Sequence, residues 1–313
     1  MQIHRWQSGW SPSQAVALTI GNFDGVHLGH QAMLYQLQQA ALARNLDSML
    51  MSFFPHPKMV LQQARFTTIT TLPDRAFWLD YYRLQHWLLL AFTPSLRKVS
   101  AREFVLDYLL KRLNVRYLLV GDDFRFGYKG LGDIELLQKM AQAFGFEVQA
   151  HESVRYADNG RRVSSSIIRQ ALFDHDLALA QAYLGHALTF TGRVRHGDKR
   201  GRALGAPTLN LHVPENWCLP DGVYVVKVNI LAQNESVWGV ANVGKTLTFA
   251  GKHRKLEVFL FGGRYQLYEQ RLQVEIKHFI RKMRQFDTQE ALQAQIQQDI
   301  IDARAVIARL SAN

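Results

Sequence analysis

The residue pattern of this chain changes once, near Leu184-Gly185, and that change limits the folds open to it. Between residues 15 and 150, apolar runs alternate with segments whose apolar residues recur at helical spacing. Beyond Gly185, short alternating segments follow one another with little helix between them. The first pattern favours a parallel sheet covered by helices, and the second favours an antiparallel barrel or sandwich. We therefore expect two domains, residues 1–184 and 185–313.

Strand and helix boundaries follow from the same patterns. We predict helices behind Pro73 and behind the capping box Ser100-Ala101-Arg102-Glu103. The apolar stripe of residues 292–310 predicts one long C-terminal helix, capped by Asp287, that packs on the second domain. The predicted strands of the first domain are residues 15–20, 48–54, 86–92, 116–120 and 146–150. Those of the second domain are residues 188–194, 208–211, 222–228, 237–243, 255–261 and 271–276.

The charge balance and the lack of long apolar runs narrow the classes of function. With 37 Lys and Arg against 26 Asp and Glu, the net charge of +11 favours anionic partners. Basic residues are spread along the whole length, which favours phosphorylated small molecules over nucleic acid. No run approaches the roughly 20 apolar residues that a membrane span needs, and residues 1–6 lack an apolar signal core. We expect a cytoplasmic protein, and the single cysteine, Cys218, fits a reducing compartment.

A glycine-rich turn, residues 21–30, lies between the first predicted strand and a helix. Its glycines let backbone N–H groups approach an anion, and the helix N-terminus adds unpaired donors and a partial positive charge. His27 and His30 could there donate hydrogen bonds to phosphoryl oxygens. Two histidines at this spacing could also be surface or core residues, or metal ligands, although no cysteine or acidic partner completes a zinc set. The context favours stabilisation of the charge that develops when an α-phosphate is attacked.

A second polar cluster, residues 162–169, closes the first half. Its hydroxyl donors, helix N-terminus and guanidinium could converge on a departing pyrophosphate, and the residues concerned are Ser165, Ser166 and Arg169. The alternative is an ordinary capped helix on the surface.

The second half has its own dense stretch of glycines and basic residues, 192–210. A loop of this composition between strands suggests a phosphate cradle, and it is no Walker loop because no Gly-Lys-Ser/Thr ends it. Thr208 and Asn210 offer two neutral oxygens to a Mg²⁺ ion shared with nucleotide phosphates. Glu257, in a later strand, could be a general base, although a solvated face is the ordinary place for a strand glutamate.

Together these stretches resemble the prokaryotic bifunctional riboflavin kinase/FMN adenylyltransferases, and the resemblance covers nearly the whole chain. The stretch 21–31 is similar to that family's nucleotidyltransferase signature, and residues 201–210, which end in Pro-Thr-Leu-Asn, are similar to its kinase signature. The other matching stretches are 54–57, 121–127 and 164–169. The resemblance implies a Rossmann-like nucleotidyltransferase domain followed by a β-barrel riboflavin kinase domain with a long C-terminal helix.

The resemblance also implies two reactions and a set of residues. Riboflavin and ATP give FMN and ADP, and FMN and a second ATP give FAD and pyrophosphate. Mg²⁺ would enter with ATP, without a permanently bound cofactor, and the chain would be a monomer or weak oligomer. The catalytic residues would be His27, His30 and Glu257, and the metal ligands Thr208 and Asn210. Substrate and nucleotide would bind Gly21, Asn22, Phe23, Asp24, Gly25, Asp123, Phe124, Ser164, Ser165, Ser166, Arg169, Gly197, Gly201, Arg202, Gly205 and Pro207.

The chain departs from the family pattern in its kinase half. The family has an Arg-Pro pair where this chain has Thr246-Leu247, and His and Asp where it has Phe259 and Gly262. An adenylyltransferase with a degenerate kinase module is therefore one alternative. An RNA-binding or flavin-sensing protein, suggested by the net charge, is another.

Overall fold

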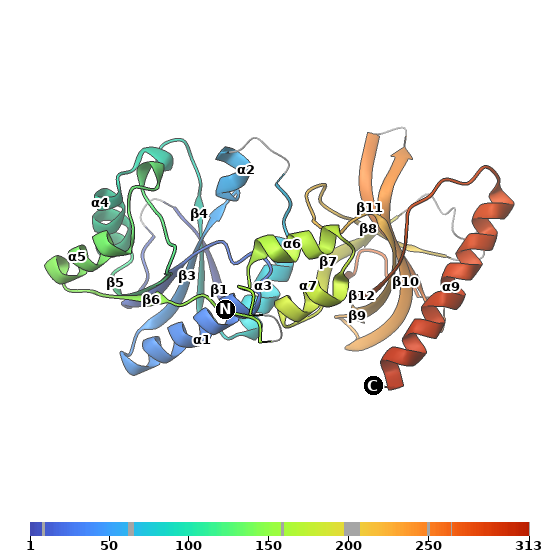
Figure 1. Cartoon of the computed structure of the whole chain (residues 1–313), viewed down its shortest axis with the longest axis horizontal. Helices are drawn as coiled ribbons and strands as arrows, with labels where there is room; N and C mark the ends of the chain where they lie inside the picture. The colour runs from blue at the N-terminus through green and yellow to red at the C-terminus, as the bar shows by residue number, and fades with distance from the viewer. Residues whose placement is uncertain are drawn as a thin grey trace. The chain divides into compact units, whose positions relative to one another are not determined.

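The computed structural model describes residues 1–7, 10–61, 66–157, 160–196, 207–248, 251–263 and 265–312 (Figure 1). Contacts between residues divide the chain into two compact units. Unit 1 comprises Met1–Phe66 and Arg75–Ser164, and unit 2 comprises Thr67–Asp74 and Ser165–Asn313. A short piece of the first half of the chain, residues 67–74, is thus counted with the second unit, and we call it the strap.

Unit 1 contains a six-stranded sheet in the order β1-β4-β3-β2-β5-β6, in which every paired neighbour is parallel. The parallel sheet predicted from the sequence is therefore confirmed. Its strands are β1 (Gln2–Arg5), β2 (Val16–Ile20), β3 (Asp47–Phe54), β4 (His86–Ala91), β5 (Val115–Gly121) and β6 (Glu147–His151).

The centre of the sheet is apolar because it is covered on both faces. All five residues of β2 are buried, and Val16, Ala17 and Leu18 are fully inaccessible to solvent. An unbroken apolar run is typical of such a strand. The edge strand β1 was not predicted, since Gln2–Arg5 is short and mostly polar; it pairs with β4, with Ile3 opposite Trp87.

The helices of unit 1 include the two that were predicted behind capping signals. Ser100 does cap a helix, because its hydroxyl accepts a hydrogen bond from the Glu103 backbone N–H at 3.1 Å. The helix then widens into a π-helix, which the sequence pattern did not indicate. The helical elements are α1 (Leu28–Ala43), α2 (Pro57–Leu61), α3 (Leu72–Tyr81), η1 (Leu96–Lys98), α4 (Ala101–Glu103), η2 (Phe104–Arg112), η3 (Tyr128–Gly130) and α5 (Ile134–Phe144). The first three residues of α3 belong to the strap.

Unit 2 is built on a closed barrel in the order β10-β11-β8-β7-β12-β9. All of its strand pairs are antiparallel, which confirms the predicted barrel. Two helices, α6 (Ser165–Phe173) and α7 (Leu177–Leu184), precede the barrel in this unit. The strands are β7 (Leu188–Arg195), β8 (Leu209–His212), β9 (Gly222–Ile230), β10 (Glu235–Thr248), β11 (Gly251–Leu260) and β12 (Arg271–Lys282).

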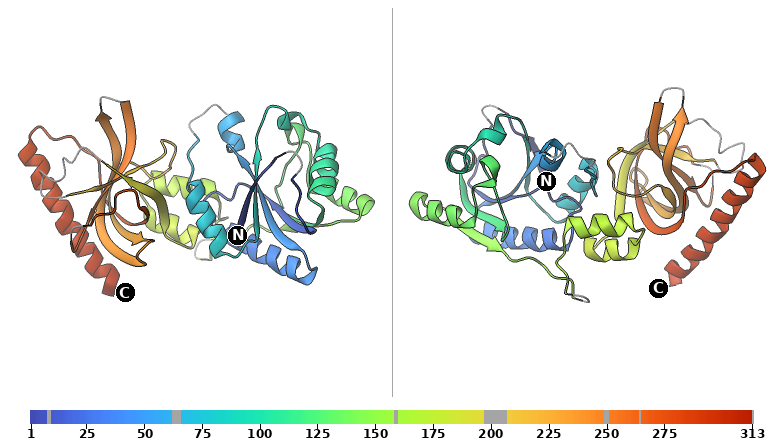
Figure 2. Two further views of the ribbon diagram at one scale, coloured as in Figure 1. Left: turned by 180° about the vertical axis from the view of Figure 1, so that it is seen from behind. Right: turned by 45° about the horizontal axis from the view of Figure 1, so that its top comes forward.

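The long C-terminal helix α9 (Gln289–Ala312) lies along the barrel strands, as Figures 1 and 2 both show. Ala303 and Val306 pack there against Val225 and Val240. The predicted cap was wrong by one residue: the Thr288 hydroxyl, not Asp287, accepts the first free N–H, from Ala291 at 3.1 Å. Among the described residues, no helix is long and apolar enough to cross a membrane.

Candidate active sites

The turn after β2 has an unusual backbone that neighbouring strands hold in place. Phe23 and Val26 take positive φ angles of 50° and 42°, which side chains other than glycine rarely adopt, and Gly25 takes 93°. The Ser52 hydroxyl donates to the Gly21 carbonyl at 2.8 Å. The predicted nucleotide ligand Asn22 accepts a hydrogen bond from the Phe53 backbone N–H at 3.2 Å, so its side chain ties the turn to the end of β3.

The two predicted catalytic histidines lie together at the start of α1. His27 is the N-cap residue, and its Nδ1 accepts a hydrogen bond from the His30 backbone N–H at 3.3 Å. The two rings stack with centroids 3.6 Å apart, and Phe23 stacks on the other side of His30 at 4.4 Å. While Nδ1 accepts, the neutral ring of His27 carries its proton on Nε2. The ring of His27 therefore places an Nε2 donor at the start of α1.

Gly29 provides the space that this arrangement needs. A Cβ atom at this position would lie 3.2 Å from His27 Cε1 and 3.8 Å from the carbonyl oxygen of Val163. The chain just before Ser164 therefore passes the start of α1, within unit 1. The next predicted residues, Ser165, Ser166 and Arg169, lie on α6 and are counted in unit 2.

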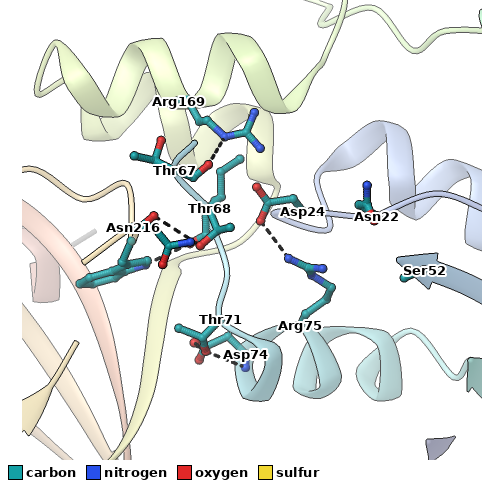
Figure 3. Close-up of polar contacts among 12 residues, drawn as sticks. Asn22, Asp24, Ser52, Thr67, Thr68, Thr71, Asp74, Arg75, Arg169 and Asn216 are labelled. Carbon is teal, nitrogen blue, oxygen red and sulfur yellow. Dashed lines mark hydrogen bonds and ion pairs between the residues drawn. The ribbon is translucent and has the colours of Figure 1, made fainter. Parts of the chain in front are cut away.

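Asp24 is buried and paired with a residue that the sequence did not indicate. Its carboxylate accepts a hydrogen bond from Arg75 Nη2 at 3.1 Å, and the two side chains are only 2% and 7% exposed (Figure 3). Arg75 lies on α3, 51 residues further along the chain. No local pattern could have revealed a pairing between segments so far apart.

The predicted flavin-side residues lie in the loop after β5. Asp123 is exposed and accepts a hydrogen bond from Arg162 at 2.7 Å. Phe124 is partly buried against the core of the sheet, and its ring stacks on Phe126 with centroids 5.6 Å apart. In this loop Asp123 is therefore solvent-accessible and ion-paired, while the aromatic side chain is held by packing.

The strap is bound to unit 2 largely through its backbone (Figure 3). Thr68 donates its N–H to Asn216 at 2.7 Å and accepts from the Cys218 N–H at 2.9 Å. Arg169, predicted to bind pyrophosphate, donates from Nε to the Thr67 carbonyl at 2.8 Å. The indole of Trp217 donates to the Ile69 carbonyl at 3.0 Å.

The strap ends at Asp74, a carboxyl group that is fully buried. Its Oδ2 accepts a hydrogen bond from the Thr71 hydroxyl, and Thr189 and Thr191 of β7 also lie beside it. Burial raises the pKa of Asp74 to about 6, and these neighbouring hydroxyls offset only part of the rise. Within the described residues, Asp74 Oδ1 and Thr191 Oγ1 have no hydrogen-bond partner. The site therefore binds the carboxyl proton more tightly than water does.

Replacing Asp74 with asparagine should change how stability depends on pH. The folded-state pKa of about 6 exceeds the ordinary value of 3.8, so the folded protein binds this proton more tightly than the unfolded chain does. The free energy of unfolding of the wild type therefore falls as the pH rises from the lower pKa to the higher one. Asparagine stays neutral. Relative to wild type, Asp74→Asn should gain up to about 3 kcal/mol between about pH 4 and about pH 7. Chemical denaturation of both proteins at the two pH values measures this, and a pH-independent difference between them would contradict it.

Two predicted kinase residues and one asparagine that was not predicted lie on three neighbouring strands of the barrel. Glu257 on β11 is the register partner of Asn210 on β8 and, on its other side, of Asn242 on β10. Register partners in an antiparallel pair point to the same face, so the three side chains form one polar row. Asn242 was not predicted; its buried Oδ1 has no hydrogen-bond partner within the described parts of the chain.

Oxygen atoms suited to Mg²⁺ are present at this row. Asn210 Nδ2 donates to the Thr208 carbonyl at 3.4 Å, which leaves the amide oxygen of Asn210 for another partner. An amide oxygen and a hydroxyl are hard ligands of the type that Mg²⁺ takes, with nucleotide phosphates supplying the rest. Pro207 is exposed at the start of this segment. The other predicted residues of the loop lie outside the described residues, and these are Gly197, Gly201, Arg202 and Gly205.

Comparisons with known proteins agree over both units. A family model described as FAD synthetase matches residues 11–167, and one described as riboflavin kinase matches residues 184–307. A bifunctional riboflavin kinase/FMN adenylyltransferase of Escherichia coli strain K12 is 39% identical over 295 residues, covering 94% of this chain and 93% of the relative. One of Pseudomonas fluorescens is 39% identical over 311 residues and covers 98% of each. The chain belongs to this family.

One similar solved structure is described by a different name from that of the relatives above. A Streptococcus pneumoniae protein described as a macrolide-efflux protein has a TM-score of 0.78 and 32% identity, covering 93% of this chain and 94% of its own. The likeness therefore extends over the FAD synthetase and the riboflavin kinase domains alike.

Phe259 and Gly262 stand at two positions where the resemblance implies other residues, and the structure shows their surroundings. Phe259, two residues after Glu257, packs with Phe261 in the apolar cluster between the barrel and α9. Gly262 has a φ angle of 89°, a conformation that favours glycine over aspartate. At these two positions, where the resemblance implies His and Asp, the chain has an aromatic residue in an apolar cluster and a glycine in a turn. The side chain of Leu247 lies outside the described residues.

Proposed function

We propose that this chain catalyses two successive steps, each at its own site. In the first, riboflavin and ATP give FMN and ADP; in the second, FMN and ATP give FAD and pyrophosphate. The observation that carries the proposal is the existence of two separate sets of polar side chains, each in its own compact unit: the stacked pair His27 and His30 on α1, and the cross-strand pair Asn210 and Glu257.

Adenylyl transfer would use the start of α1. A phosphate oxygen of FMN attacks the α-phosphorus of ATP, the bond to the β-phosphate breaks, and pyrophosphate leaves. Hydrogen-bond donors and oriented N–H groups stabilise the charge on the phosphorus-bound oxygens, and no covalent nucleophile is needed. His27 Nε2 and His30 would supply those donors. The nucleotide would contact Gly21, Asn22, Phe23, Asp24 and Gly25, the flavin Asp123 and Phe124, and the pyrophosphate Ser164, Ser165, Ser166 and Arg169.

Riboflavin phosphorylation would use the polar row of the barrel. Glu257 would accept the proton of the ribityl 5′-hydroxyl as its oxygen attacks the γ-phosphorus, and ADP leaves. Thr208 and Asn210 would hold Mg²⁺ bound to the ATP phosphates, which lowers the repulsion met by the incoming oxygen. The phosphates would bind the loop that contains Gly197, Gly201, Arg202, Gly205 and Pro207.

The domain roles follow from this assignment. Residues 1–184 would be the FMN adenylyltransferase domain and residues 185–313 the riboflavin kinase domain. We propose a cytoplasmic monomer or weak oligomer whose partners are riboflavin, FMN, FAD and Mg-ATP, with no permanently bound cofactor and no need for nucleic acid or membrane.

Two parallel incubations test the proposal. Purified protein with ATP and Mg²⁺ is given either riboflavin or FMN, and the flavins are separated by chromatography. Riboflavin should yield FMN and FAD, and FMN should yield FAD. Conversion of FMN alone would support an adenylyltransferase with a degenerate kinase module, and failure to convert either flavin would overturn both assignments.

A further inference from the structure

The pair of Asp24 and Arg75 is unusually well buried for two charged side chains. Their atoms Oδ1 and Nη2 are 3.1 Å apart, and neither side chain exceeds 7% exposure. Removing one partner from such a pair leaves an uncompensated charge in a poorly solvated position, which is strongly unfavourable. Asp24 and Arg75 therefore depend on each other for their places.

Asp24 lies in the same turn as the histidines, so a displacement of its backbone would also move them. It stands between Phe23 and Gly25, both at positive φ, and three residues before the N-cap His27. The Nδ1 bond of His27 and the stacking of Phe23 on His30 both depend on the path of this turn. A residue that fixes Asp24 thus helps fix the donors at the start of α1.

Arg75 begins the part of α3 that belongs to unit 1. It follows Asp74 directly in the first part of α3, and Asp74 is buried in unit 2 beside Thr71. The strap before it is hydrogen-bonded to Asn216 and Cys218 of the same unit. The guanidinium that binds Asp24 therefore extends from the first part of α3 (Figure 3).

We propose that Arg75 is a positioning residue for adenylyl transfer, acting through Asp24 on the turn that carries His27 and His30. The inference rests on the proposed function of the two histidines. Arg75 does not itself bind a phosphate in this account, because its guanidinium is engaged with a buried carboxylate. Its contribution is the geometry of the turn that follows β2.

The test compares Arg75→Met with Arg75→Lys and with the double variant Asp24→Asn/Arg75→Met. Methionine keeps much of the side-chain volume but leaves Asp24 buried without its cation. Because small misplacements of catalytic groups cost up to 100-fold in rate, we expect kcat for FMN adenylylation to fall about 10- to 100-fold in Arg75→Met. The KM values for ATP and FMN should change much less. Riboflavin phosphorylation in the same preparation should be unchanged.

The other two variants separate positioning from general damage. Lysine keeps the charge and should restore part of the lost kcat. The double variant removes both charges, so its kcat for adenylylation should be no lower than that of Arg75→Met, whereas independent effects on kcat would multiply. The loss of Asp24 as a nucleotide contact is read separately, from the KM for ATP. Arg44→Met is a matched control, because Arg44 forms an exposed ion pair with Glu147 in the same unit, and it should retain both activities.

Three results would overturn the inference. One is unchanged kcat in Arg75→Met while His30→Ala loses adenylylation, which leaves the proposed function intact. A second is a parallel loss of both activities in Arg75→Met and Arg75→Lys with a lowered melting temperature, which indicates a purely structural role. The third is full adenylylation in His30→Ala, which shows instead that the proposed function of the turn is wrong.

Discussion

Replacing His30 with alanine should lower kcat for the conversion of FMN to FAD by about 10²- to 10³-fold, the usual effect of losing one donor to a developing oxyanion. Riboflavin phosphorylation should continue at its normal rate, because the barrel has its own polar residues. The substitution also removes the ring that stacks between Phe23 and His27. Steady-state kinetics with FMN and with riboflavin on the same preparation measure both effects.

A second histidine of unit 1 provides the control for this experiment. His4 lies on the edge strand β1, where its ring is hydrogen-bonded to His86 at 3.1 Å. His4→Ala should retain both activities. Equal loss of both activities in His30→Ala would contradict two separate sites, as would loss of riboflavin phosphorylation alone.

Replacing Glu257 with glutamine should have the opposite selectivity. A general base contributes about 10²- to 10⁴-fold, so kcat for riboflavin phosphorylation should fall by that factor while conversion of FMN to FAD is unchanged. Glutamine keeps the shape of the side chain and its place between Asn210 and Asn242, but it cannot accept the proton. Product formation from riboflavin, followed with saturating Mg-ATP, measures the loss.

An exposed glutamate of the same barrel gives the matched comparison. Glu235 begins β10 and lies away from the polar row, so Glu235→Gln should retain full riboflavin phosphorylation. If Glu257→Gln also retained it, the proton would have to be accepted elsewhere, and the role proposed for Glu257 would be wrong.

The sequence predicted the two architectures because their hydrophobic patterns are strong. The fully buried run of β2 is typical of a central parallel strand, and the alternating segments after Gly185 became the strands of the closed barrel. Features with weak local signals were missed. The edge strand Gln2–Arg5 is short and polar. The helix cap is Thr288 rather than Asp287, and the sequence pattern does not fix the start of a helix to within one residue.

Several contacts that position the candidate sites could not be predicted from local sequence patterns, because the residues that meet are far apart in the chain. His27 and His30 are three residues apart, so helix geometry alone brings them together. The partner of Asp24 lies 51 residues away, and Asn242 reaches Glu257 only through the register of β10 and β11. Which distant segments meet depends on the packing of the whole unit. The burial of Asp74 among threonines of the strap and of β7 has the same origin.

The fate of the ATP phosphates tests the account of two reactions most directly. Purified protein is given riboflavin, Mg²⁺ and ATP that carries radioactive phosphorus at either the γ or the α position. We expect γ-labelled ATP to label FMN, whereas α-labelled ATP should label FAD and leave FMN unlabelled. Absence of the γ label from FMN would contradict the kinase site, and absence of the α label from FAD would contradict adenylyl transfer.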